Sequence, residues 1–117
     1  MSFFSESETA CRCGCGMNIT KPMLAKLNEA RKVAGVPFVI TSGARCVEHN
    51  RKVGGTPNSS HIRGLAVDIA CTSSQARFAI LNGLFAAGFK RIGYNHSRNF
   101  FHCDIDESLP QNVFFEY

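Results

Sequence analysis

The chain has 117 residues, of which 44% are hydrophobic and 19% are charged. This length suits one domain with one hydrophobic core, and the composition excludes a disordered or low-complexity chain. The net charge of +4 favours a polyanionic partner only weakly. Because the basic residues are scattered along the chain without a dense run, we expect no nucleic-acid binding.

No apolar run approaches the roughly 20 residues that span a bilayer, so we expect no membrane insertion. Residues 1–10 have no basic segment followed by an apolar stretch. We therefore expect no secretory signal peptide and a protein that is made in the cytoplasm. Without export, the thiols of the six cysteines begin reduced.

Residues 1–18 form a cysteine-rich segment that we expect to pack on the single domain of residues 1–117. Its three cysteines alternate with other residues, which is a tighter spacing than that of paired cysteines in the usual zinc ribbon. They are Cys11, Cys13 and Cys15. A structural zinc site, a disulfide and a set of small buried thiols are the alternatives for this segment. The remaining cysteines stand alone in the sequence, at Cys46, Cys71 and Cys103.

The first long element predicted is a helix that begins after Thr20 and ends near Gly35. Thr20 is a typical N-cap, a proline falls in the first turn, and an apolar stripe follows. The compact β-branched run at residues 37–41 predicts a strand. Residues 46–53 predict a short helix, and the Gly, Pro and Asn of residues 54–58 predict a loop.

Alternating bulky and small side chains at residues 65–71 predict a second strand. The pattern from Thr72 to Gln75 is typical of a capping box and predicts a helix that stops at Gly88. Further strands are expected near residues 91–94, 100–105 and, as a last edge strand, 113–117. This order contains no repeated unit, and it favours an α+β fold with a small antiparallel sheet and helices packed on one side.

Polar side chains interrupt two of these strands. Asp68 points away from its apolar neighbours, and His102 and Asp104 share a face because they are two residues apart. If the two strands lie side by side, Asp68 and His102 converge, and His61, in the loop before the earlier strand, can reach the same point. Two imidazoles and a carboxylate with an open fourth position are the ligand set of a catalytic zinc. Such a metal lowers the pKa of a bound water toward about 7 and polarises a carbonyl group.

The segment at residues 59–68, S-S-H-I-R-G-L-A-V-D, resembles the S-x-H-x-x-G-x-A-x-D motif of peptidase family M15, the zinc D-alanyl-D-alanine carboxypeptidases and endopeptidases. Residues 101–104 resemble the H-x-D element of its small single-domain branch. Residues 41–45 resemble its S-G-x-R turn, and residues 50–55 its N-x-x-V-G-G stretch. Cys13-Gly-Cys15 is similar to a feature of short phage and bacterial members. The resemblance spans residues 4–106 and implies the fold of bacterial cell-wall dipeptidases and the hedgehog signalling domain.

The resemblance implies that His61, Asp68 and His102 bind one catalytic Zn²⁺, although such ligands accept iron or manganese in other proteins. It also implies that Arg45 holds a substrate carboxylate or steadies the developing oxyanion. Ser59 is expected to support the loop or the substrate, with turn formation as the alternative.

The sequence offers more than one residue for the role of general base. Several branches of the family place Glu or Asp three residues before the second ligand histidine, where this chain has Asn99, which cannot accept a proton at neutral pH. We expect Asp104 to be the base, and the alternative is that it hydrogen-bonds a ligand histidine and fixes its tautomer. His96 is a further candidate for proton transfer, with a surface position as the alternative. Asp106 and Glu107 are predicted to be turn acids.

The sequence predicts a monomeric zinc-dependent peptidase that hydrolyses bonds in the stem peptides or cross-links of bacterial peptidoglycan. The resemblance to phage lysis enzymes implies that it acts on the cell wall after release. The alternative is a catalytically inactive, zinc-containing module that binds a wall peptide or a protein partner. A third interpretation places the only zinc on Cys11, Cys13 and Cys15.

Overall fold

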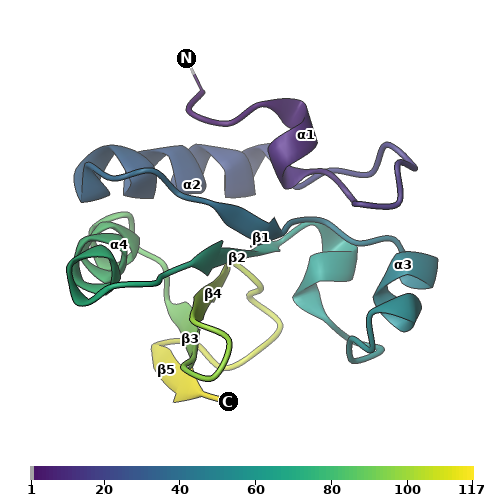
Figure 1. The fold of residues 1–117 in the computed structure, drawn as a ribbon. Helices are drawn as coiled ribbons and strands as arrows, with labels where there is room; N and C mark the ends of the chain where they lie inside the picture. The colour runs from purple at the N-terminus through teal and green to yellow at the C-terminus, as the bar shows by residue number, and fades with distance from the viewer. Residues whose placement is uncertain (1) are drawn as a thin grey trace.

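A five-stranded sheet with two long helices on one face organises the computed structural model, which describes residues 2–117 (Figure 1). The elements in chain order are α1 (Glu6–Thr9), α2 (Lys21–Ala34), β1 (Ile40–Ser42), α3 (Val47–Lys52), the 3-10 helix η1 (Ser60–Arg63), β2 (Ala66–Ala70), α4 (Ser74–Ala86), β3 (Arg91–Asn95), β4 (Phe100–Asp104) and β5 (Val113–Glu116). Among the helices of the described residues, none combines the length and the apolarity that a membrane crossing requires.

The strands lie in the order β1–β2–β4–β3–β5. The first four form antiparallel pairs, whereas β5 runs parallel to β3. β4 ends at Asp104 opposite Arg91, the first residue of β3, and β5 begins with Val113 beside the same Arg91. Because β5 starts at the same end of the sheet as β3, the two strands run in the same direction. The predicted α+β fold is confirmed, and the sheet is mixed because of this one parallel edge.

Local capping signals explain both ends of α2. The side chain of Thr20 accepts a hydrogen bond from the backbone N–H of Met23, and Gly35 closes the helix at φ 69°, a left-handed conformation that favours glycine. The predicted helix is therefore confirmed at both ends. The predicted short helix at residues 46–53 is confirmed as α3, with Cys46 as its N-cap.

The start of α4 differs from the prediction. Its N-cap is Ser73 rather than Thr72, and the Ser73 side chain accepts from the backbone N–H of Ala76. In a capping box, the side chain of the third helical residue accepts a hydrogen bond from the backbone N–H of the N-cap. The third helical residue here is Ala76, whose side chain cannot accept one, so the predicted capping box is wrong. The elements α1 and η1 have four residues each and were not predicted, because so short a segment leaves no periodic pattern.

The hydrophobic core lies between the sheet and the pair formed by α2 and α4, which Figure 1 shows side by side. Alternate residues of β2 and β4 face these helices and are buried in the core, namely Val67, Ile69, Phe101 and Cys103. The residues between them point to the other face, as strand geometry requires. The predicted alternation is therefore confirmed, and it leaves the polar side chains of both strands on the face without long helices.

α4 approaches α2 closely at Gly83, where a Cβ atom would overlap the carbonyl oxygen of Ala30. We expect Gly83→Ala to lower the free energy of unfolding by about 1–3 kcal/mol, because the overlap with the backbone outweighs the roughly 1 kcal/mol that alanine gains in helix propensity. Denaturant unfolding measures this difference. Asn82→Ala, at an exposed position of the same helix, is the matched control and should be neutral or stabilising. Equal stability of the two variants would contradict the close approach.

Candidate metal centre

Three side chains from different elements converge on the sheet face that the long helices leave open. Asp68 on β2 lies directly opposite His102 on β4. His61 lies on η1, and Gly64, at φ 70°, turns the chain from η1 toward β2. One ligand atom from each of the three lies within 4.8 Å of the others, and the two imidazole rings are 5.3 Å apart. The structure therefore brings the predicted ligand set together.

Hydrogen bonds orient both imidazoles toward Asp68. Nδ1 of His61 donates to the carbonyl oxygen of Gly43 at 2.8 Å, and Nε2 faces Oδ1 of Asp68 at 3.4 Å, where either a proton or a metal ion can lie between them. Nε2 of His102 lies 2.7 Å from Oδ2 of Asp104, and its Nδ1 lies 3.1 Å from the same Oδ1 of Asp68. Outer partners of this kind fix the tautomer and orientation of a metal-binding histidine. Two ring nitrogens and a carboxylate oxygen arranged in this way fit a divalent ion such as zinc.

The electrostatics of the site favour a cation. Burial alone would raise the pKa of Asp68, but hydrogen bonds from His102 and His61 hold that pKa at about 2. Burial alone would lower the pKa of His102, but its bonds to Asp104 and Asp68 raise that pKa to about 9. The groups that attract a proton here also attract a divalent cation, so protons and metal compete for the site.

The carboxylate of Asp104 is buried, and both of its oxygens have hydrogen-bond partners. Oδ1 accepts from Nε of Arg91 at 2.9 Å and from the backbone N–H of Asp106 at 3.0 Å, and Oδ2 faces His102. The residue is only 1% exposed. These contacts are those of a group that positions His102 and fixes its tautomer, which is one of the two roles that the sequence left for Asp104.

The prediction that Asp106 is an ordinary turn acid is wrong. Asp106 is 2% exposed, its carboxylate accepts from the Ser60 hydroxyl at 2.7 Å, and it pairs with the Arg63 guanidinium. Although burial would raise the pKa of Asp106, bonds from Ser108, Ser60 and Arg63 hold that pKa well below its usual range. Since Ser60 and Arg63 belong to η1, Asp106 anchors the element that carries His61. Glu107, the other predicted turn acid, is exposed.

The three ligand candidates lie on the wall of a cleft of about 1130 Å³. The only carboxylates among its described lining residues are Asp68 and Asp104. Four arginines also line it, namely Arg12, Arg45, Arg91 and Arg98. Apart from the ligand set itself, the cleft is therefore cationic and suits an anionic ligand.

Arg45 has an unused donor in this cleft. Its Nη1 donates to Oδ1 of Asn50 at 3.0 Å, while its Nε is the one buried side-chain nitrogen or oxygen in residues 2–117 without a hydrogen-bond partner. Asn50 is held by a bond to the carbonyl oxygen of Thr56 at 2.8 Å. Gly55 makes room for this pair, because a Cβ atom there would overlap both side chains. A carboxylate of a bound ligand would satisfy the free Nε.

The other predicted residues lie in different surroundings. Ser59 lines the cleft and is the N-cap of η1, where its hydroxyl accepts from the backbone N–H of His61 at 3.2 Å. Asn99 also lines the cleft, and its φ of 54° is a left-handed conformation that Asn adopts more readily than most residues. His96 is exposed in the turn between β3 and β4, its ring lies against Tyr94, and it is not among the described residues that line the cleft.

The sequence interpretation missed several cleft residues, among them Arg91, Phe115 and Tyr117. Arg91 shares a strand face with Gly93, which pairs with His102, so the alternation of β3 would have found it. Phe115 and Tyr117 also line the cleft, and the Phe115 ring lies 5.9 Å from that of His102. Burial and the nearby Asp68 charge raise the pKa of Tyr117 above its usual range. No local pattern could place these two, because they reach the cleft through the parallel pairing of the C-terminal strand with β3.

Comparison with known protein families agrees with this geometry. Residues 2–104 match the family described as Peptidase M15. This segment contains the three ligand candidates as well as Arg45 and Asp104. In a comparison with curated proteins, none matched the chain. Because the family match covers most of the sequence, the chain belongs to the peptidase M15 family.

Proposed function

We propose that the chain is a zinc-dependent peptidase that hydrolyses peptide bonds in the stem peptides or cross-links of bacterial peptidoglycan. The observation that carries this proposal is the convergence of His61, Asp68 and His102 on the wall of a cationic cleft. Membership of the M15 family supports peptide-bond hydrolysis. A zinc ion held by these three side chains would supply Lewis acidity to the reaction.

The charge of the cleft supports an acidic peptide as the substrate. Stem peptides carry carboxylates at their C-terminus and on D-glutamate, and the cleft offers four arginines against two carboxylates that are already engaged. The Nε of Arg45, which has no partner within the described chain, is available to bind one of these groups. The same donor is suited to stabilise negative charge that develops on the scissile carbonyl.

The remaining residues act by holding the site in one geometry. Asp104 accepts from Nε2 of His102 and thereby keeps Nδ1 free toward Asp68. The carbonyl oxygen of Gly43 accepts from Nδ1 of His61 and thereby leaves Nε2 of His61 to face Asp68. Ser59 caps the element that carries His61. Such support lets a site bind its metal and substrate without first reorganising its own side chains.

A second candidate is a zinc-containing module that binds wall peptides or a protein partner without hydrolysis. The observation that favours it is the shortage of a free base. Of the carboxylates that line the cleft, Asp68 belongs to the ligand set and Asp104 is engaged by Arg91, Asp106 and His102. The two candidates differ in whether peptide bonds are cleaved.

Digestion of purified peptidoglycan separates these candidates. The zinc-loaded chain should release new peptide termini, and a chelator should abolish this release, because the three-ligand site loses its metal. Mass spectrometry of the products identifies the bond that is cleaved. If no cell-wall preparation yields products although the zinc is bound, the binding module replaces the peptidase as the function.

Substitution of a ligand candidate tests where this zinc lies. His61→Ala should lose one equivalent of bound zinc and all turnover, because the site keeps only two ligands. Metal content and product release measure the two effects. The matched control is His96→Ala, which removes an exposed histidine outside the cleft and should keep its zinc. Turnover of this control also tests the proton-transfer role of His96. Full metal content in His61→Ala would contradict the three-ligand site.

Asp104→Asn distinguishes a positioning role from a general base. We expect this variant to bind zinc about 10–100-fold more weakly, because Asp104 orients His102, while turnover at saturating zinc falls by less than about 10-fold. Competition with a chelator measures the affinity, and product release at saturating zinc measures the turnover. The opposite result, with unchanged affinity and turnover reduced by roughly 10²–10⁴-fold, would identify Asp104 as the base.

Arg45→Lys tests the carboxylate-binding role. Lysine keeps the positive charge but lacks the Nε donor, so KM for peptides with a free terminal carboxylate should rise by about 10–100-fold. Peptides amidated at this terminus should show little change between the two proteins. Metal content should remain that of the unsubstituted chain. An equal increase in KM for both peptide forms would contradict the assignment.

A further inference from the structure

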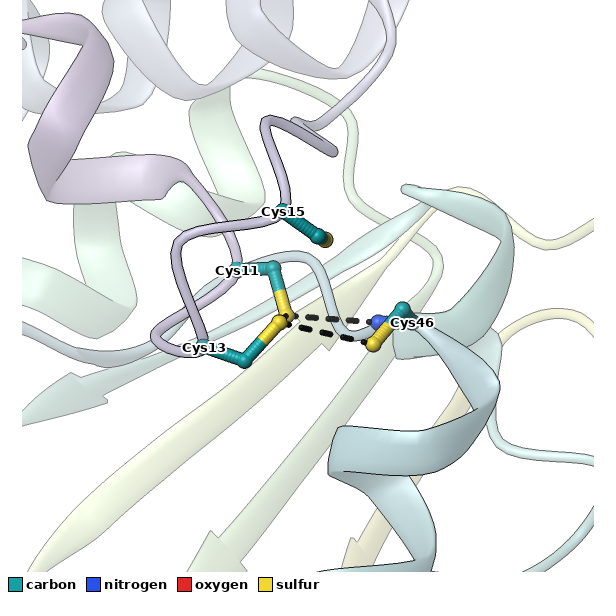
Figure 2. Close-up of side chains that lie close together, drawn as sticks. All are labelled: Cys11, Cys13, Cys15 and Cys46. Carbon is teal, nitrogen blue, oxygen red and sulfur yellow. Dashed lines mark hydrogen bonds between the residues drawn. The ribbon is translucent and has the colours of Figure 1, made fainter.

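Four cysteine side chains gather outside the cleft, at a place that the proposed function does not use. Three come from the N-terminal loop, at Cys11, Cys13 and Cys15, and the fourth is Cys46, the N-cap of α3. Figure 2 shows them between this loop and the start of α3. All four sulfur atoms lie within 4.8 Å of one another.

We propose that these four thiols form a structural site for a second Zn²⁺, distinct from the His61, Asp68 and His102 centre. Structural zinc is bound tetrahedrally by four ligands at about 2.3 Å, which places the sulfurs of a four-cysteine site about 3.8 Å apart. In the structure, Sγ of Cys13 lies 3.3 Å from that of Cys11 and 3.6 Å from that of Cys46. The cluster therefore already has nearly the dimensions that the metal requires.

The loop backbone explains how the tight spacing can supply three ligands. In an extended strand, alternate side chains point the same way but lie roughly 6–7 Å apart, which is too far for one zinc ion. Here Gly14, between Cys13 and Cys15, and Gly16, directly after Cys15, have φ values of 81° and 90°, a conformation that favours glycine, and they turn the chain on both sides of Cys15. Bonds from the Gly14 N–H to the Cys11 carbonyl at 3.2 Å and from the Cys11 N–H to the Met17 carbonyl at 2.8 Å close the loop.

Backbone N–H groups are directed at two of the sulfurs. The N–H of Cys46 donates to Sγ of Cys11 at 3.4 Å, and the N–H of His49 donates to Sγ of Cys46 at 3.3 Å. Metal sites in proteins hold their ligands through outer hydrogen bonds of this kind. The first of these bonds connects the loop with the start of α3, so that ligands 35 residues apart in the sequence face each other, and the second caps α3.

Disulfides are the alternative for a group of neighbouring cysteines, and the arrangement favours a metal instead. A disulfide joins one sulfur to one other, whereas Sγ of Cys13 contacts two sulfurs and all four thiols share one centre. The two cysteines outside the group, Cys71 and Cys103, are buried in the core. All six cysteines are free of disulfides in the structure, and a reduced cysteine binds zinc as its thiolate.

A metal at this place would fasten the N-terminal segment to the loop that supports the cleft. Cys46 directly follows Arg45, and the N–H of Ala44 donates to the carbonyl oxygen of Thr9 at 2.9 Å. Gly43, whose carbonyl orients His61, lies against the same part of the N-terminal segment, because a Cβ atom there would overlap the Thr9 backbone. The four-thiol site thus has a supporting role, and it does not touch the substrate.

Metal analysis of purified variants tests this proposal without any measurement of activity. The unsubstituted chain should contain two zinc ions, Cys13→Ser and Cys46→Ser should each contain one, and His61→Ala should also contain one. The matched control is Cys71→Ala, which removes a cysteine outside the group and should retain two. If Cys13→Ser and Cys46→Ser keep the full metal content of the unsubstituted chain, the proposal is overturned.

Cobalt substitution identifies the ligands and remains informative if a cysteine variant fails to fold. Co²⁺ bound to His61→Ala should show the sulfur-to-metal charge-transfer absorption of a tetrahedral thiolate site, because only the four-thiol site remains. Cobalt binding without this absorption would overturn the proposal. An intact mass that is lower by two hydrogens per disulfide, with reduced chain unable to take up the second metal, would also overturn it. The charge-transfer absorption of the four-thiol site should appear whether or not the His61 centre binds metal, so the two sites are tested independently.

Discussion

The pairing of Asp68 with His102 across β2 and β4 determines where the site can form. The two residues are in register, and Oδ1 of Asp68 lies 3.1 Å from Nδ1 of His102. A slip of one residue would turn both side chains toward the helices, where an ionised carboxylate would lose its partners. Val67 and Phe101 oppose this slip, because they are buried in the core only in the observed register. Hydrophobic burial on one face therefore sets the geometry of the polar site on the other.

His61 depends on contacts from two further directions. The carbonyl of Gly43, which follows β1, fixes its ring, and Asp106, which follows β4, anchors η1 through Ser60. A buried carboxylate is stable only when its desolvation is offset by several good partners, and Asp106 has them. The position of one ligand thus depends on segments that are distant in the sequence.

Support for the cleft extends beyond the segment that matches the family. The match ends at residue 104, whereas Phe115 and Tyr117 of the C-terminal segment line the cleft. Within the matched segment, Thr9 of α1 packs against the part of the chain that carries Gly43 and Arg45. The proposed four-thiol site would strengthen this second contact, because metal ligands from two segments restrict both.

Elements with strong local signals could be predicted from the order of the amino acids alone. Thr20 and Gly35 marked both ends of α2, and the alternation of β2 and β4 placed Asp68 and His102 on one face. The motif around His61 then completed the ligand set. These features were predictable because capping and strand periodicity are decided by residues that are close together in the chain.

Four features became visible only in the folded chain: the hydrogen bonds of Asp104, the burial of Asp106, the parallel direction of β5 and β3, and the position of Cys46 beside the N-terminal cysteines. Each of these features depends on a contact between residues far apart in the sequence. Local periodicity carries no information about such partners, because their contacts form only when the sheet and its loops assemble. Charged and polar side chains in particular take their roles from the neighbours that satisfy them.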